Sequence, residues 1–313
     1  MSHQVRIARF SCITQIPYPS ASKFILGSRQ YTQGALQKSS WTHPVYTQEQ
    51  IQSVKIAHRN AKCLPDKLAL ETVRFLRWGM DFVTGYRANS PLSKPNRMTE
   101  RKWITRFVFL ESVAGVPGMV AGMLRHLKSI RQMKRDYGWI ETLLEEAYNE
   151  RMHLLTFLQL AKPGWKMRTM VLGTQCVFFT AFFMAYILSP RICHRFVGYL
   201  EEEAVITYTK AIKDLDDGCL PLWKSLGAPA MAVKYWQMPE GNRCMRSLLL
   251  YVRADEAKHR DVNHTLGSLD QDRDRNPFSA KFREQIGKVN DVIDSRVPDE
   301  LYIRSQQRQR VKE

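Results

Sequence analysis

The sequence predicts an all-α protein whose helices form one bundle. Long segments carry apolar residues at helical spacing, and no segment shows the strict alternation of a half-buried strand. Hydrophobic residues make up 44% of the 313 residues, which is enough for a buried core and too much for a disordered chain. The expected helices are residues 65–85, 103–128, 139–161, 170–188, 191–215 and 242–267.

Proline and glycine mark the ends of these helices. Pro65 lies at the start of the first helix and Gly85 at its end, which are favoured positions for these two residues. The third and fourth helices stop before Pro163 and Pro190, because proline disfavours a helical residue in front of it. In the second helix, glycine and proline at residues 115–118 predict a bend or a break.

Charge and cysteine content limit the class of protein. The chain has a net charge of +17 at pH 7, which favours an anionic partner, either a nucleic acid or a membrane surface. No two cysteines form a C-x-x-C pair, so the sequence predicts reduced thiols and argues against a zinc finger or a disulfide framework. The six cysteines are Cys12, Cys63, Cys176, Cys193, Cys219 and Cys244.

The first 48 residues have the composition of a targeting segment. The first acidic residue is Glu49, and the residues before it include arginines and many serines and threonines. This composition is typical of mitochondrial or chloroplast transit peptides. We therefore expect a mitochondrial or chloroplast transit peptide and N-terminal arm at residues 1–48, a helical domain at residues 49–267 and a polar C-terminal tail at residues 268–313, with residues 40–64 irregular.

The fourth helix is apolar enough to enter a membrane. Residues 170–188 carry no charge over 19 positions, which meets the length of a spanning helix. The other long apolar stretch, residues 107–124, contains Glu111, which is costly in lipid. We therefore favour a monotopic protein, in which the first and fourth helices lie flat in one leaflet, over two transmembrane spans. A buried helix of a soluble protein remains an alternative.

Two helices carry a carboxylate and an imidazole three residues apart. These pairs are Glu150-x-x-His153 and Glu256-x-x-His259, and residues at this spacing share a helix face. Two other helices offer an inward glutamate, Glu111 and one member of Glu201-Glu202-Glu203. One glutamate from each of two helices and Glu-x-x-His from two more is the pattern of a di-metal site in a ferritin-like four-helix bundle. The alternative is that these glutamates lie on solvated helix faces.

Helical spacing selects among the remaining polar residues. Glu201 lies seven residues before Tyr208, so the two share a face, and Glu202 points elsewhere. Asn149 precedes His153 by four residues, and Asp255 precedes His259 by four. Each is expected to hydrogen-bond the imidazole, either supporting a metal ligand or holding the ring away from the metals. Carboxylates with imidazoles suit iron or manganese.

Four blocks of the sequence resemble the signature blocks of the mitochondrial alternative oxidases. The resemblance covers roughly residues 65–267, and no expected ligand position departs from it. A cysteine equivalent to the regulatory cysteine of plant members is not evident. The blocks are FLESVAGVPG (residues 109–118), NERMHL (149–154), LEEEA (200–204) and RADEAKHR (253–260).

The resemblance implies a cyanide-insensitive ubiquinol oxidase that reduces dioxygen to water without pumping protons. It implies two iron ions and a homodimer bound to one leaflet of the mitochondrial inner membrane, facing the matrix, with no nucleic-acid partner. It assigns Tyr208 an electron and proton transfer during dioxygen reduction, and Glu203 the acceptance of a proton from quinol. The implied metal residues are Glu111, Glu150, His153, Glu201, Glu256 and His259, and the implied quinol residues are Arg77, Arg106, Leu110, Glu203, Ala204 and Thr207.

Three other functions fit parts of this pattern. A plastid relative that oxidises plastoquinol shares the transit composition, although the block at residues 149–153 favours the mitochondrial branch. A ferritin-like protein without catalysis shares the carboxylate pattern but is usually soluble and acidic. A basic helical protein that binds nucleic acid or membranes needs no metal and predicts that Glu111 and Glu150 are dispensable.

Overall fold

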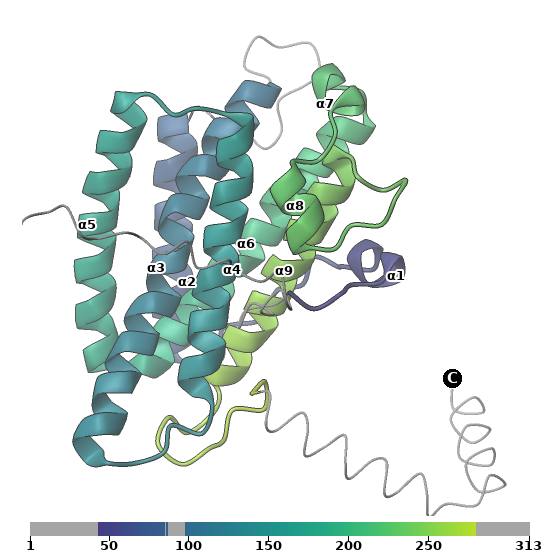
Figure 1. Cartoon of the computed structure of the whole chain (residues 1–313). Helices are drawn as coiled ribbons and strands as arrows, with labels where there is room; N and C mark the ends of the chain where they lie inside the picture. The colour runs from purple at the N-terminus through teal and green to yellow at the C-terminus, as the bar shows by residue number, and fades with distance from the viewer. Residues whose placement is uncertain (1–42, 85, 87–97, 280–313) are drawn as a thin grey trace, which may run out of the picture. The chain divides into compact units, whose positions relative to one another are not determined.

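The regular structure of the described chain is helical (Figure 1). The computed structural model describes residues 43–84, 86 and 98–279, and the predicted all-α class is confirmed for them. The predicted transit peptide before residue 43 and the end of the polar tail lie outside the described residues. The helices are α1 (Gln48–Gln52), α2 (Leu64–Thr84), α3 (Glu100–Gln132), α4 (Trp139–Leu160), α5 (Trp165–Leu188), α6 (Pro190–Asp216), α7 (Pro221–Ser225), α8 (Ala230–Tyr235) and α9 (Met245–Leu266).

Four long helices form the bundle and two flank it. Helix α3 packs along α4, and α6 packs along α9. Helix α5 lies against α3 and α6, and α2 lies against α6, so these two helices cover the outside of the four (Figure 1). The predicted arrangement of a four-helix bundle with two flanking helices is therefore confirmed.

Proline and capping side chains explain where some of the long helices begin. Helix α6 starts with Pro190 in its first turn, and the side chain of Ser189 accepts a hydrogen bond from the backbone N–H of Ile192. Helix α3 runs unbroken through Pro117, so no break occurs at residues 115–118. Pro117 removes one backbone hydrogen bond, but packing against α4 and α5 holds the helix on both sides.

The remaining differences from the sequence prediction concern short helices and helix ends. Helix α5 begins at Trp165, five residues earlier than expected. Helices α1, α7 and α8 were not predicted, and α1 falls in the segment expected to be irregular. Each is five or six residues long and buries one side chain, Ile51, Trp223 or Ala232. Helices this short depend on tertiary packing, because a few residues are not enough to stabilise a helix in water.

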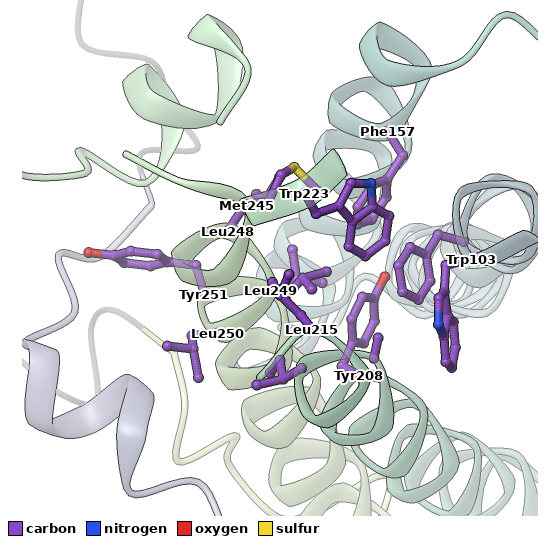
Figure 2. Close-up of a cluster of buried hydrophobic side chains, with 14 of the residues drawn as sticks. Trp103, Phe157, Tyr208, Leu215, Trp223, Met245, Leu248, Leu249, Leu250 and Tyr251 are labelled. Carbon is purple, nitrogen blue, oxygen red and sulfur yellow. The ribbon is translucent and has the colours of Figure 1, made fainter. Parts of the chain in front are cut away.

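Two apolar clusters fill the bundle at different levels. One contains Trp103, Phe157, Tyr208 and residues of the first half of α9, and Figure 2 shows these side chains packed together. The other contains Val120, Leu143, Tyr199 and Val262. Along each of the four bundle helices, a glutamate stands between a residue of the first cluster and a residue of the second. The carboxylates therefore form a polar layer between two apolar ones.

Two described helices pass a length and composition test for membrane spans. These are α3, whose apolar window is 44% buried, and α5, whose window is 11% buried. The burial of α3 is typical of a core helix, which passes the same test. Helix α5 is mostly exposed and apolar on nearly all sides, which is unusual for a helix surrounded by water.

Candidate metal centre

The bundle brings the four predicted glutamates and both histidines together. Glu111 comes from α3, Glu150 and His153 from α4, Glu201 from α6, and Glu256 and His259 from α9. All six side chains are buried, with at most 5% of each residue exposed. The alternative that these glutamates lie on solvated helix faces is therefore excluded.

The six residues form two overlapping groups with the geometry of adjacent metal positions. The ligand atoms of Glu111, Glu150, His153 and Glu256 all lie within 4.8 Å of one another. The same holds for Glu150, Glu201, Glu256 and His259. Glu150 and Glu256 belong to both groups, as carboxylates that bridge two ions would. Four carboxylates balance the charge of two divalent cations.

The chemistry of these side chains fits metal ions. Buried carboxylate oxygens normally have hydrogen-bond partners. Among the described residues, however, Oε2 of Glu111 and Oε2 of Glu150 have none. Nδ1 of His153 lies 3.3 to 3.4 Å from oxygens of Glu111, Glu150 and Glu256 without a hydrogen bond to them. Bound cations would satisfy these lone pairs.

Asp255 holds the other side of the His153 ring. Its Oδ2 lies 3.2 Å from Nε2 of His153, so Nδ1 faces the glutamates. Oδ2 also accepts hydrogen bonds from the indole N–H of Trp236 at 2.8 Å and from the amide of Asn149 at 3.1 Å. A carboxylate on the far nitrogen fixes the orientation and tautomer of a metal-binding imidazole.

The partners of Asn149 and Asp255 differ from the spacing argument. Asp255 contacts His153 on the facing helix, and not His259 in its own helix. Asn149 donates to Asp255 and to the hydroxyl of Tyr235, at 2.9 Å, and not to His153. The expectation of hydrogen bonds between residues four apart was therefore wrong, because both polar groups point across the bundle.

The N-terminal arm reaches the same carboxylate. His43 and Tyr46 precede α1, and each places a side-chain atom 2.7 Å from Oδ1 of Asp255. Asp255 is fully buried, and these charged and hydrogen-bonded neighbours hold its pKa well below the usual range even though burial acts in the opposite direction. Asp255 is therefore an anion beside His153.

Burial and mutual repulsion separate the pKa values of the glutamates. Burial raises the pKa of Glu111 to about 8, and burial with repulsion from Glu256 raises that of Glu201 well above its usual value. Burial acts in the same direction on Glu150, but His153 and His259 outweigh it and lower its pKa. Without metal, four charged carboxylates in this buried layer repel one another too strongly to remain ionised together.

Tyr208 contacts the centre from the apolar side. Its hydroxyl donates a hydrogen bond to Oε1 of Glu111. Its ring stacks on Phe107 with 4.7 Å between ring centroids and on Phe157 with 6.3 Å, and Figure 2 shows Tyr208 within this aromatic cluster. Burial and the negative charge of Glu111 raise the pKa of Tyr208. A neutral tyrosine therefore links the carboxylates to the aromatic cluster.

The polar residues implied for quinol binding form a second cluster. Arg77 of α2 pairs with Glu203 of α6 and with Asp81, whose carboxylate lies 3.0 Å away. Arg106 of α3 lies 2.6 Å from the same aspartate, and its guanidinium stands over the ring of Tyr86, 4.5 Å from the centroid. Asp81 therefore joins the two arginines that the sequence analysis singled out.

The other three implied quinol residues lie on the same two helices. Thr207 is buried and its hydroxyl donates to the backbone carbonyl of Glu203 at 2.8 Å. Ala204 follows Glu203 and is half-buried. Leu110, also half-buried, directly precedes Glu111 in α3. The residues implied for quinol thus adjoin the residues implied for metal along both α3 and α6.

Comparison with known proteins identifies the family. A family model described as alternative oxidase matches residues 46–268. The chain belongs to the alternative oxidase family. It is 68% identical to the mitochondrial alternative oxidase of Aspergillus niger over 79% of this chain and 71% of the relative. It is 66% identical to that of Emericella nidulans over the same shares, and 55% identical to that of Botryotinia fuckeliana over 90% of this chain and 85% of the relative.

Membership of the alternative oxidase family establishes the activity. The chain is a ubiquinol oxidase, and the resemblance seen in the four sequence blocks is confirmed. The buried glutamates and histidines agree with a metal-dependent oxidase of this family. The match begins at residue 46, so it includes α1 and part of the arm that the sequence analysis left outside its helices.

Sequence reasoning missed several residues that support the alternative oxidase centre. Asp81 lies four residues after Arg77 on one helix face, a spacing that signals an ion pair. His43, Tyr46 and Trp236 meet Asp255 from segments outside the long helices. These three contacts have no local pattern, so the sequence offered no signal for them.

Proposed function

We propose that this alternative oxidase binds two iron ions among Glu111, Glu150, Glu201, Glu256, His153 and His259 and reduces dioxygen to water there. The observation that supports the proposal is the pair of overlapping buried groups that share Glu150 and Glu256. Oxygen and imidazole ligands suit iron, which when bound supplies the redox chemistry with dioxygen. The reaction balances as two ubiquinols and one dioxygen giving two ubiquinones and two waters, so no net proton uptake is required.

The chain's own residues bind quinol and move its protons in this proposal. Fixed charges for binding the quinol head group come from Arg77, Arg106 and Asp81. The side chains between these charges and the metal residues are Leu110, Ala204 and Thr207. Glu203 accepts a proton from a quinol hydroxyl, because its carboxylate lies beside Arg77, which stabilises the ionised form. Tyr208 donates a proton and an electron toward dioxygen, since its hydroxyl already points at Glu111.

Oxygen uptake by purified, iron-loaded protein tests this function. With a short-chain ubiquinol, we expect uptake that persists in cyanide and far slower uptake with plastoquinol. Glu150→Ala and Glu256→Ala remove carboxylates common to both metal positions, so each is expected to bind less than one iron per chain and to lose uptake. Glu141→Ala, at an exposed position of α4, is the control and keeps both properties. Full activity of the Glu150 variant would refute the proposed centre.

We further propose that α2 and α5 bind one leaflet of the mitochondrial inner membrane from the matrix side. Leu68, Phe75, Trp78 and Phe82 form an exposed apolar stripe along α2, and α5 exposes a similar set that includes Leu172, Val177 and Ile187. Exposed Lys166 and Arg168 at the start of α5 suit lipid phosphates. Phe75→Glu is expected to weaken binding to anionic vesicles, whereas Phe75→Leu retains it. Equal binding of both variants would contradict the role of α2.

Two further parts of this assignment concern assembly and targeting. Met119, Met123, Leu127 and Ile130 form an exposed apolar stripe on α3, which supports a homodimer. Sedimentation of the detergent-purified protein tests the dimer, and Leu127→Asp is expected to give monomers.

Residues 1–48 act as a mitochondrial transit peptide and arm, residues 49–267 as the oxidase domain and residues 268–313 as a polar tail. Import into isolated mitochondria tests the first of these.

A further inference from the structure

A cavity lies beside the proposed metal centre, between α4 and α9. It has a volume of about 30 Å³. Glu145, Glu146 and Asn149 of α4 line it, together with Lys258 and His259 of α9, and the arm residue His43 closes one side. His259 places its Nδ1 2.7 Å from Oε1 of Glu150. The cavity therefore adjoins the metal residues through His259, and none of the residues implied for quinol lines it.

Glu146 is a buried carboxylate without an assigned role. It lies one helical turn before Glu150, and only 8% of the residue is exposed. Its Oε1 accepts a hydrogen bond from the amide of Asn263 at 2.5 Å. Its Oε2 has no hydrogen-bond partner among the described residues. Glu146 lines this cavity and also a second, smaller one that Asn263 lines as well. Because Asn263 takes Oε1, Oε2 is the oxygen that can bind an ion.

An unpartnered carboxylate oxygen in such a place is costly unless something binds it. Burying a polar oxygen without a partner destabilises the fold, and buried polar atoms in native proteins generally have partners. Neither the quinol cluster nor the six residues of the metal centre use this oxygen. A cation that passes through the cavity would meet it directly.

The outer end of the cavity carries a balanced pair of charges. Nζ of Lys258 lies 3.1 Å from Oε1 of Glu145, and the two side chains are each about one-third exposed, at 34% and 33%. Inward from this pair the lining changes to the buried Glu146, Asn149 and His259. Charged and polar side chains thus line the cavity from the partly exposed pair to the buried His259.

The size of the cavity determines how a metal ion would move through it. A volume of about 30 Å³ holds roughly two water molecules. A ferrous ion with six waters is larger than this, so it must exchange water for protein oxygen atoms on the way. The free oxygen of Glu146, one turn before Glu150, is placed for that exchange.

We propose that this cavity is the route by which ferrous iron reaches the buried centre, and that Glu146 binds the ion before Glu150 and His259 receive it. The inference rests on the proposed metal centre. Glu146 is then a transient ligand that speeds loading without belonging to the final site. Iron leaves by the same route when a chelator removes it.

Anaerobic loading of the metal-free, full-length protein with ferrous iron tests the route. Bound iron per chain is measured over time after rapid desalting. Glu146→Gln keeps the size of the side chain and the acceptor for Asn263 but removes the charge, so we expect loading about tenfold slower, with two irons per chain at the end. Release to a chelator is expected to slow as well. Glu141→Gln, an exposed carboxylate on the same helix that does not line the cavity, loads at the unaltered rate.

A second variant, Lys258→Met, tests the route even if Glu146→Gln does not fold correctly. Lys258→Met takes a positive charge from the outer end and leaves Glu145 free, so loading is expected to be about threefold faster at low salt. If Glu146→Gln fails to reach two irons per chain, an unchanged rate in Lys258→Met overturns the route and a faster rate supports it. If Glu146→Gln reaches two irons at the unaltered rate, the route is wrong. If the unaltered protein binds no iron, the proposed metal centre itself fails.

Discussion

Gly118 allows α3 and α4 to approach closely two turns away from the metal residues, and replacing it with alanine tests how strictly this spacing is set. A Cβ at position 118 would lie 2.6 Å from the backbone oxygen of Leu143 and 3.0 Å from Cβ of Ala147. Ordinary contact begins near 3.4 Å, so the helices must separate by roughly 0.8 Å. A backbone oxygen cannot rotate away, unlike the end of a flexible side chain.

The size of the effect follows from two opposing contributions. Overpacking of this kind costs about 1–3 kcal/mol, and alanine in place of glycine within a helix returns about 1 kcal/mol. Gly115→Ala is the matched control, because its Cβ would meet nothing closer than 3.4 Å. We expect Gly118→Ala to lie about 2 kcal/mol below Gly115→Ala in stability, which corresponds to roughly 4–8 °C in Tm for a domain of this size.

Thermal unfolding of the purified, metal-free variants measures this difference. Iron binding gives a second readout, because Gly118 lies seven residues after Glu111 and Leu143 lies seven before Glu150. Separation of the helices at Gly118 therefore widens the distance between these two carboxylates, and iron affinity should fall in Gly118→Ala alone. Equal Tm values and equal iron binding in the two variants would show that the helix contact does not set the geometry of the site.

Three other predictions concern the centre and its surroundings. Asp255→Asn keeps the shape of the side chain but removes the anion beside His153, so iron affinity measured by equilibrium dialysis should fall about 10–100-fold, and unaltered affinity would contradict the positioning role. Tyr208→Phe should keep two irons per chain and lose most oxygen uptake, and full turnover would exclude proton and electron donation by Tyr208. Burial lowers the pKa of His194 to about 4 from 6.5. The unfolded chain therefore binds a proton between these pH values while the folded chain does not, so stability falls by roughly 3 kcal/mol as pH drops from 6.5 to 4. His194→Gln should remove this part of the acid sensitivity, and an identical pH profile in chemical unfolding would refute it.

The sequence predicted which glutamates and histidines the bundle brings together, because their pattern is local. Glu150 and His153 share a helix face by spacing alone, and the same holds for Glu256 and His259. Once helix positions are known, apolar neighbours decide which face turns inward, as for Glu111 in α3. The long helices were found for a similar reason, since each carries apolar residues at helical spacing or, in α5, an apolar run without charge.

The surroundings of the centre could not be predicted because they depend on distant segments. His43 and Asp255 are 212 residues apart in sequence, and Tyr46 reaches the same aspartate over 209 residues. Trp236 comes from the segment just after α8, a helix too short to show an apolar period. Such contacts are set by how helices pack, which a single sequence does not encode in any local spacing.

The three consecutive glutamates of α6 show how one helix serves three parts of the protein. Adjacent residues of a helix point about 100° apart. Glu201 faces the metal residues. Glu202 accepts a hydrogen bond from the backbone of Arg59 at 2.9 Å and lies 2.8 Å from Nε2 of His264. Glu203 pairs with Arg77. Glu202 therefore points away from the metal residues, as expected, and its carboxylate is buried and paired.

Single substitutions at these positions should give three different defects. Glu201→Gln is expected to lower iron content, because it alone of the three lies within the metal group. Glu202→Gln should keep two irons per chain but lower stability by about 1–3 kcal/mol, since it weakens contacts between α6, α9 and the segment before α2. Glu203→Gln should keep both iron and stability and lose quinol turnover. A shared defect in all three variants would mean that α6 acts as a single structural unit, and the separation of roles along its turn would be wrong.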